Sequence, residues 1–145
     1  MIETRAESII HRPIDIVFEY LYTLENQTEY NTSIKSAIKN PEIPGNLPTY
    51  TIEINLALFQ LTEKYCVKEV YVNQFFIAHC DHTLLSFEDR YEFKEEENGS
   101  TLVKIYDRME LKGLLRWSEG FIKNNLATQM KENLERVKRN IETRI

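Results

Sequence analysis

The sequence contains few cysteines, no excess of positive charge and no long hydrophobic run. Its two cysteines, Cys66 and Cys80, lie 14 residues apart without a CxxC motif, which excludes a disulfide framework and a zinc-ligand pattern. The formal net charge of −5 argues against nucleic acid as a partner, because phosphate binding needs a concentrated basic surface. Lys and Arg near the C-terminus alternate with Glu, as is typical of a solvated helix face.

Other absences narrow the function classes further. No apolar stretch approaches the length that spans a membrane, and the first residues are polar, unlike a secretory leader. We therefore expect a cytoplasmic protein with free thiols and no membrane insertion. No Gly-flanked Ser or Cys suggests a nucleophilic catalytic site. The three histidines, His11, His79 and His82, fall on different segments, so neither a metal nor another cofactor is expected.

The composition that remains is that of an ordinary globular protein. The chain has 145 residues, of which 42% are hydrophobic and 28% are charged. A chain of this length buries about two thirds of its unfolded surface when it folds as one unit. Because no internal repeat or low-complexity segment divides the sequence, we expect a single domain over residues 1–145.

The first 31 residues predict one strand and two short helices. Residues 2–11 mix Ile with polar residues and read as a strand that ends near Pro13, which suits the first position of a helix. Apolar residues follow Pro13 at helical spacing, and a second short helix is expected over residues 26–31.

The middle of the chain predicts six consecutive strands. The segment from Tyr50 to Phe59 alternates apolar and polar residues, as a half-buried strand does. Glu97-Asn98-Gly99 is a hairpin signal, because Asn and Gly tolerate positive φ. The expected strands cover residues 34–40, 50–59, 61–72, 75–82, 84–95 and 101–112.

A long helix is predicted from Gly113 to the C-terminus. Its apolar stripe recurs mostly every four residues, at Leu115, Ile122, Leu126, Met130, Leu134, Val137 and Ile141. So long a helix needs a long apolar partner, and only the sheet provides one. The expected fold is therefore α+β, with a curved seven-stranded antiparallel sheet wrapped around this helix. A ligand site is expected where the twisted sheet and the helix diverge.

The sequence resembles the START-like (SRPBCC) superfamily, the helix-grip fold, over nearly its whole length. It looks closest to the branch named polyketide cyclase/dehydrase and lipid transport. The motifs that carry the resemblance are Ile10-x-x-Pro13-x-x-x-Val17-Phe18, Leu24-Glu25-Asn26-x-x-Glu29-Tyr30-Asn31, Tyr91-x-Phe93, Asn98-Gly99-Ser100-Thr101 and Lys112-Gly113-Leu114-Leu115. In the second motif Tyr30 replaces the family's usual Trp. The resemblance implies a domain that binds small ligands, and it supplies no invariant catalytic residue for this chain.

Two aspartates are the most specific site candidates. Asp89 shares a strand face with Tyr91 and two Phe residues, and Asp107 shares one with Val103 and Ile105, so both aspartates should turn inward with these apolar neighbours. A three-residue hairpin loop pairs Asp89 directly with Asp107, about 5 Å apart. Such a pair suits acid–base work or the binding of a ligand hydroxyl. The alternative is a register shift, or a wet cavity mouth where the pair has no role.

Uncharged polar residues are further candidates for lining the cavity. The set expected beside the two aspartates is Tyr30, Tyr65, His79, Tyr91, Asn125 and Gln129. For each residue alone, an ordinary core or surface role is the alternative. Leu114, Trp117 and Phe121 lie off the main helical stripe, and they suit a lid over the pocket, a dimer contact or ordinary packing against the first strand.

Three functions are compatible with these features. The first is binding or transport of a small hydrophobic molecule, such as a lipid, an isoprenoid or quinone, or a polycyclic aromatic compound. The second is a cyclase/dehydratase-type enzyme that acts on a polyketide-like substrate through Asp89, Asp107 or a tyrosine. The third is a macromolecular interaction module with a vestigial pocket. The expected inward faces are largely Ile, Leu, Val and Phe, which favours the first function, in a monomer or weak homodimer.

Overall fold

The computed structural model describes residues 1–56 and 59–144. Its strands are β1 (Ile2–Ile10), β2 (Ile34–Lys39), β3 (Thr49–Leu56), β4 (Phe59–Tyr71), β5 (Phe75–Asp81), β6 (Leu85–Glu95) and β7 (Thr101–Leu111). Its α-helices are α1 (Ile14–Tyr22), α2 (Gln27–Tyr30) and α3 (Glu119–Thr143), with short 3-10 segments at Leu24–Asn26 and Gly113–Ser118. The predicted strand 50–59 includes residues 57 and 58, which lie outside the described residues.

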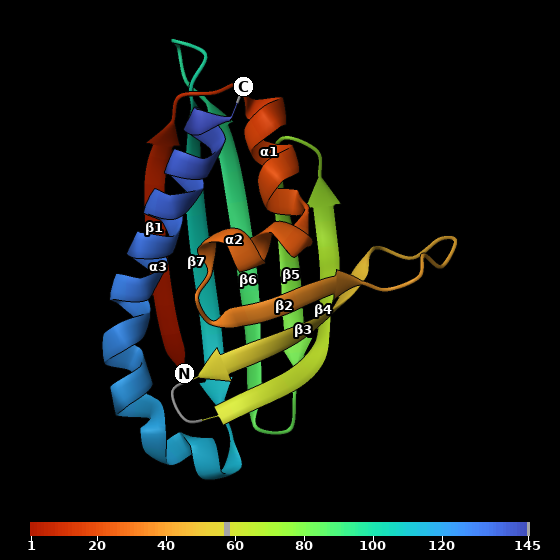
Figure 1. Cartoon of the computed structure of the whole chain (residues 1–145), viewed down its shortest axis with the longest axis vertical. Coiled ribbons are helices and arrows are strands. Elements are labelled where there is room, and N and C mark those ends of the chain that lie inside the picture. Colours follow the sequence, from red (N-terminus) through yellow and green to blue (C-terminus); the bar gives the residue numbers. More distant parts are fainter. Residues whose placement is uncertain (57–58, 145) are drawn as a thin grey trace.

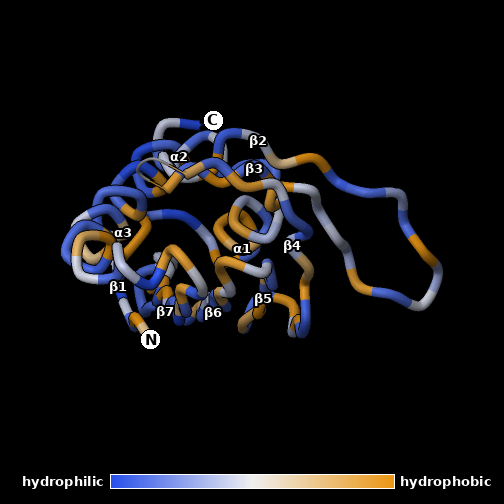
Figure 2. Tube along the Cα trace, turned by 90° about the horizontal axis from the view of Figure 1, so that it is seen from below, coloured by the Kyte–Doolittle hydropathy of each residue, from blue (hydrophilic) through white to orange (hydrophobic). Residues whose placement is uncertain are grey.

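The seven strands form one antiparallel sheet in the order β1-β7-β6-β5-β4-β3-β2. The sheet curves strongly, so that β2 and β3 fold back over β6 and β7 while α1 lies inside the curve (Figures 1 and 2). Helix α3 runs beside β1 along the open side of the curve. The expected α+β helix-grip architecture is therefore confirmed.

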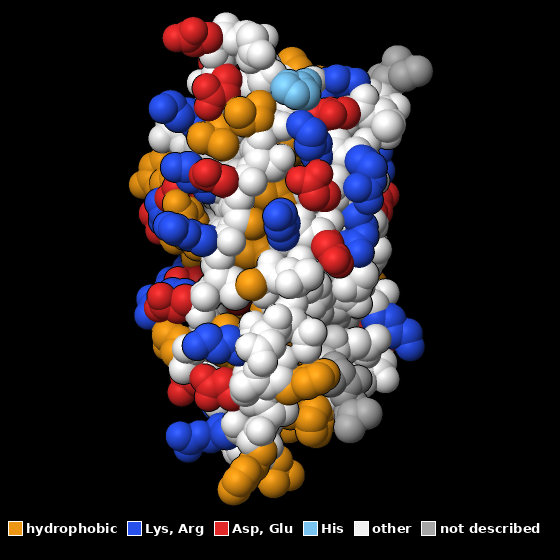
Figure 3. All heavy atoms as spheres, turned by 90° about the vertical axis from the view of Figure 1, so that its left-hand side faces the viewer, with side chains coloured by type: hydrophobic (Ala, Val, Ile, Leu, Met, Phe, Trp, Pro, Cys, Tyr) orange, Lys and Arg blue, Asp and Glu red, His pale blue; other side chains and the backbone are white. Residues whose placement is uncertain are grey.

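The apolar stripe of α3 explains how the helix is held. Ile122, Leu134, Val137 and Ile141 are buried, while Leu126 and Met130 are partly buried. The opposite face of the helix carries Lys and Arg interspersed with Glu, as Figure 3 shows for the side of the molecule formed by α3 and β1. No helix in the described part of the chain is long and apolar enough to cross a membrane.

The beginning of the C-terminal helix differs from the prediction. Residues Gly113–Ser118 form a 3-10 segment, and Gly113 itself turns the chain with a φ of 56°. Only Leu115 of this segment is buried, whereas Leu114, Trp117 and the nearby Phe121 are 76%, 91% and 64% exposed. Packing of these three side chains against the first strand was therefore a wrong expectation. Their roles as a lid or a dimer contact remain predictions.

The β6–β7 hairpin has the register that its loop predicts. Glu96 and Ser100 close the loop through a backbone hydrogen bond of 2.8 Å, and Gly99 adopts a φ of 80°. Asp89 is consequently the direct partner of Asp107. The same register places Tyr91 opposite Ile105, so one inner face changes from apolar to acidic within two residues.

Candidate functional site

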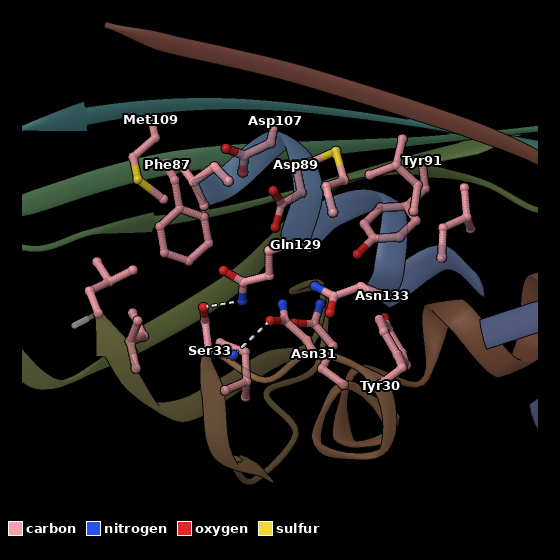
Figure 4. A pocket seen from close by; sticks show the side chains of 18 residues that line it. Tyr30, Asn31, Ser33, Phe87, Asp89, Tyr91, Asp107, Met109, Gln129 and Asn133 are labelled. Carbon is pink, nitrogen blue, oxygen red and sulfur yellow. Dashed lines mark hydrogen bonds between the residues drawn. The ribbon is translucent and has the colours of Figure 1, made fainter. Parts of the chain in front are cut away.

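A cavity of about 90 Å³ lies between α3 and the sheet. Strands β6 and β7 provide its floor, α3 provides one wall, and the segment from α2 to β3 provides the other. In Figure 4, Asp89 and Tyr91 point into the cavity from the sheet, and Gln129 and Asn133 reach in from α3. About half of the lining side chains are aliphatic, Phe or Met, and the other half carry a polar group, so the cavity has both apolar and polar surface.

The acid pair, Asp89 and Asp107, occupies the floor of this cavity. Asp107 is 6% exposed. Asp89 is partly exposed, and its carboxyl points into the cavity (Figure 4). Among the described residues, Asp107 Oδ1 has no hydrogen-bond partner.

Asp89 is oriented from behind by two residues. The Tyr65 hydroxyl donates a hydrogen bond to Asp89 Oδ2, and Gln27 Nε2 donates one to the Tyr65 hydroxyl at 3.3 Å. Tyr65 is fully buried and Gln27 is 2% exposed, so this chain of hydrogen bonds lies inside the protein. It fixes the Asp89 carboxyl and leaves Asp107 as the less satisfied member of the pair.

Burial favours the protonated form of the acid pair. Burial raises the pKa of Asp107 well above its ordinary range, and the nearby charge of Asp89 raises it further. Burial also raises the pKa of Asp89, although hydrogen bonds from Asp107 and Tyr65 oppose the shift. The two carboxyls can share a hydrogen bond only if one of them holds a proton, so the acid pair titrates as a unit.

Two tyrosines border the acid pair. Burial raises the pKa of Tyr30 and of Tyr91, so both side chains are neutral hydroxyls at physiological pH. Tyr30 is 3% exposed, and its hydroxyl lies near that of Tyr91 without a hydrogen bond of good geometry. The Tyr30 hydroxyl is therefore a second buried polar group without a partner among the described residues.

A short polar contact joins the two walls of the cavity, α3 and the segment before β2. Gln129 Nε2 donates hydrogen bonds to Ser33 Oγ at 2.5 Å and to Thr32 Oγ1 at 3.0 Å, which ties α3 to the segment before β2 (Figure 4). Asn31 Oδ1 accepts the Ser33 N–H at 3.0 Å and holds that segment in shape. We call the contact between Gln129, Thr32 and Ser33 the polar latch.

The structure brings most of the predicted site residues together. Those that line the cavity are Tyr30, Asp89, Tyr91, Asp107 and Gln129. Tyr65 lies directly behind Asp89. Whether any of these residues binds a ligand stays a prediction.

Two of the predicted positions lie elsewhere. His79 is on the outer face of β5, because Phe76, Ala78 and Cys80 are the residues that this strand buries. The outer face was predicted to be the inner one, because Phe75 and Ile77 share it with His79. On that face the guanidinium of Arg90 lies over Phe75, 4.4 Å from the ring centre.

Asn125 is exposed and donates a hydrogen bond to the Phe121 carbonyl of its own helix. On α3 the neighbouring Leu126 turns inward instead.

Several polar lining residues were not anticipated from the sequence. They are Gln27, Asn31, Ser33 and Asn133. Asn133 follows Gln129 by one helical turn, and this spacing was a usable signal. Gln27 begins the four-residue helix α2 and Ser33 lies in the turn before β2, and neither segment is long enough for periodicity to show which side chains turn inward. Within the described residues, no group of three or more His, Cys, Asp or Glu side chains is arranged to hold a metal ion.

Comparison with known proteins supports the fold through structure alone. No protein-family model matches the sequence, and a search of curated proteins finds no match. A START superfamily protein from Mycobacterium smegmatis superposes with a TM-score of 0.80 at 11% identity, over 97% of each chain. The Zhui aromatase/cyclase from Streptomyces sp. R1128 gives 0.71 at 9% identity, over 97% of this chain and 93% of that one. A protein from Thermus thermophilus gives 0.72 at 18% identity, over 97% and 94%.

These likenesses define the class of fold. The chain has the START-like helix-grip fold, as its sequence motifs implied, and its structural neighbours include START proteins and polyketide aromatase/cyclases. At such low identities the likeness establishes the fold and says nothing of the ligand.

Proposed function

We propose that this protein binds a small, largely apolar molecule beneath α3 and holds a polar group of that molecule at the acid pair. The observation that carries the proposal is the buried acid pair at the floor of the cavity, with Asp107 Oδ1 unpartnered among the described residues and nine Ile, Leu, Phe and Met side chains lining the same cavity. A buried polar group without a partner lowers stability, and a retained group of this kind is typical of a binding site.

The size of the cavity indicates that binding requires opening. Its volume is about 90 Å³. Sites for drug-sized ligands measure roughly 300–1,000 Å³, and an engineered protein cavity of about 150 Å³ holds benzene. The wall that can yield is α3, where Leu126 and Met130 are only partly buried and the polar latch, with the hydrogen bond from Arg136 to the Tyr30 carbonyl, links the helix to the facing segment.

Binding of a neutral apolar probe tests this proposal. The natively folded protein should bind prodan, a neutral naphthalene fluorophore, with roughly micromolar affinity, which corresponds to about 8 kcal/mol. Fluorescence titration gives the affinity, and native mass spectrometry of protein purified from its own host shows whether a ligand is carried. Leu126→Trp places a large side chain at the cavity wall and should weaken prodan binding at least tenfold.

The matched control separates the cavity from the protein surface. Trp117 is the most exposed large hydrophobic residue of the described chain, at 91%, and it could bind prodan nonspecifically. Trp117→Ser should therefore leave the affinity unchanged. If Trp117→Ser removes binding while Leu126→Trp preserves it, the cavity is not the binding site and the proposal is wrong.

Acid–base catalysis of the cyclase/dehydratase type is the second candidate function. Burial raises the pKa of Asp107 well above its ordinary range, which favours this function, because a carboxyl with a raised pKa is a better-placed general acid. The test is loss of water from a poly-β-keto test substrate, detected by mass spectrometry. Asp107→Asn should abolish that reaction while prodan binding remains. No loss of water above the background rate would leave binding as the function.

A further inference from the structure

We infer that the ligand carries a protonated amine, held between Asp89 and Asp107 on the floor of the cavity and Tyr30 on the facing wall. This inference rests on the proposed function and narrows it to one chemical class, that of small apolar amines.

The charge of the cavity lining is the first argument. Asp89 and Asp107 are the only charged side chains that line the cavity among the described residues, and Lys, Arg and His are absent from that lining. With one shared proton, the pair still carries one negative charge in a site shielded from water. A carboxylate or phosphate ligand would be repelled there, and a neutral ligand would leave the charge uncompensated. An ammonium group neutralises it.

The count of hydrogen-bonding groups is the second and independent argument. An ammonium group has three N–H donors and no acceptor. The cavity offers acceptors on two sides: the Asp89 carboxyl and Asp107 Oδ1 on the sheet, and the Tyr30 hydroxyl oxygen on the facing wall. The last two are buried, and neither has a hydrogen-bond partner within the described chain. Tyr30 lies across the cavity from the sheet, so the three groups surround the site from two sides (Figure 4).

The surrounding side chains suit the rest of such a ligand. Phe87, Tyr91 and Tyr30 line the cavity with aromatic rings, whose faces attract a cation. Met109 and Met130 line it with flexible thioether chains that adapt to an apolar body. The acid pair on the sheet holds the charged group, and the apolar body then extends toward α3, the wall that must move.

Three probes of matched size separate this inference from the proposed function. They are benzylammonium, benzyl alcohol and benzoate, each titrated at pH 7 into isotopically labelled protein and followed by the amide NMR signals of cavity residues. Benzylammonium should bind at least tenfold more tightly than benzyl alcohol, and benzoate should not bind. If none of the three perturbs the cavity, the proposed function itself fails. If benzyl alcohol or benzoate binds as tightly as benzylammonium, the cavity binds ligands and the amine assignment is wrong.

Variants that keep side-chain shape identify the groups responsible. The double variant Asp89→Asn/Asp107→Asn should erase the preference for benzylammonium over benzyl alcohol. Tyr30→Phe should weaken benzylammonium binding severalfold without affecting benzyl alcohol. Glu92→Gln is the matched control, because Glu92 lies on the same strand as Asp89 but pairs with Arg90 on the outer face of the sheet, with a distance of 2.7 Å between charged atoms. A preference that survives the double variant, or is lost in Glu92→Gln, would overturn the inference.

Discussion

The inner face of the β6–β7 hairpin contains two regions of opposite character. Near the hairpin loop, the strands contribute to a closely packed aromatic cluster whose members are Phe18, Tyr22, Phe76, Tyr91 and Phe93. Phe76 stacks on Tyr91 with ring centres 4.5 Å apart and an interplanar angle of 10°. Two residues further along each strand, the acid pair borders a cavity of about 90 Å³.

The difference shows that two neighbouring regions of one sheet can have different roles: the aromatic cluster stabilises the fold, and the acid pair is the candidate binding site. The aromatic cluster buries large side chains that contact one another directly, which is the arrangement that stabilises a core. The acid pair buries two carboxyls without a counter-ion from the described chain, which costs stability. Sites that break the rules of core packing in this way are those expected to have a function.

The largest expected effect concerns the aromatic cluster. Phe76→Ala should lower the free energy of unfolding by about 3–5 kcal/mol, because it removes a fully buried ring from the cluster. Phe87→Ala, on the other side of the acid pair, should cost less than about 2 kcal/mol, since Phe87 is partly buried and already borders the cavity. Urea denaturation of both variants measures the contrast. Equal losses would mean that the two regions do not differ in packing.

A smaller effect, of opposite sign, is expected at the acid pair. Asp107→Asn should raise the free energy of unfolding at pH 7 by about 1 kcal/mol. Burial and the charge of Asp89 raise the folded-state pKa of Asp107 above the unfolded value of about 3.9. Between these two pKa values the folded protein binds more protons than the unfolded chain, so its stability falls as pH rises through the window. Asn removes this cost and can donate a hydrogen bond to Asp89.

The pH profile of denaturation tests the sign of this effect. Urea midpoints measured from about pH 4 upwards should fall less steeply for Asp107→Asn than for the wild-type protein. The outer-face variant Glu92→Gln, at a residue that pairs with Arg90, should keep the wild-type slope. A loss of stability in Asp107→Asn would show that a cation or donor already compensates the pair in the ligand-free protein.

The sequence predicts the acid pair because a hairpin loop fixes strand register by simple counting. Asn98 and Gly99 set the loop, the alternation of β6 and β7 sets the faces, and together they place Asp89 opposite Asp107. The same reasoning fails for His79, since β5 carries large hydrophobic residues on both faces and alternation alone does not identify the inner one.

Features that depend on side-chain packing were not predictable in this way. The sequence indicated a gap between sheet and helix, but its volume depends on how Leu126, Met130 and Phe87 fill it. The polar latch joins Gln129 to Ser33, which is 96 residues away in the chain. Local periodicity carries no information about a contact of that range.

The smallest expected effect on stability concerns the polar latch, which covers the acid-pair region but not the aromatic cluster. Gln129→Ala removes two hydrogen bonds at the partly exposed edge of α3, so the free energy of unfolding should fall by less than about 1 kcal/mol. Opening of the cavity should nevertheless become more frequent, because α3 then lacks this link to residues 32 and 33. Stopped-flow mixing with prodan should show faster association for Gln129→Ala.

The matched control is Asn125→Ala, one turn earlier, whose side chain bonds only within its own helix. Equal association rates for the two variants would mean that the probe enters by another route, and the separation between a rigid aromatic region and an opening acid-pair region would not hold.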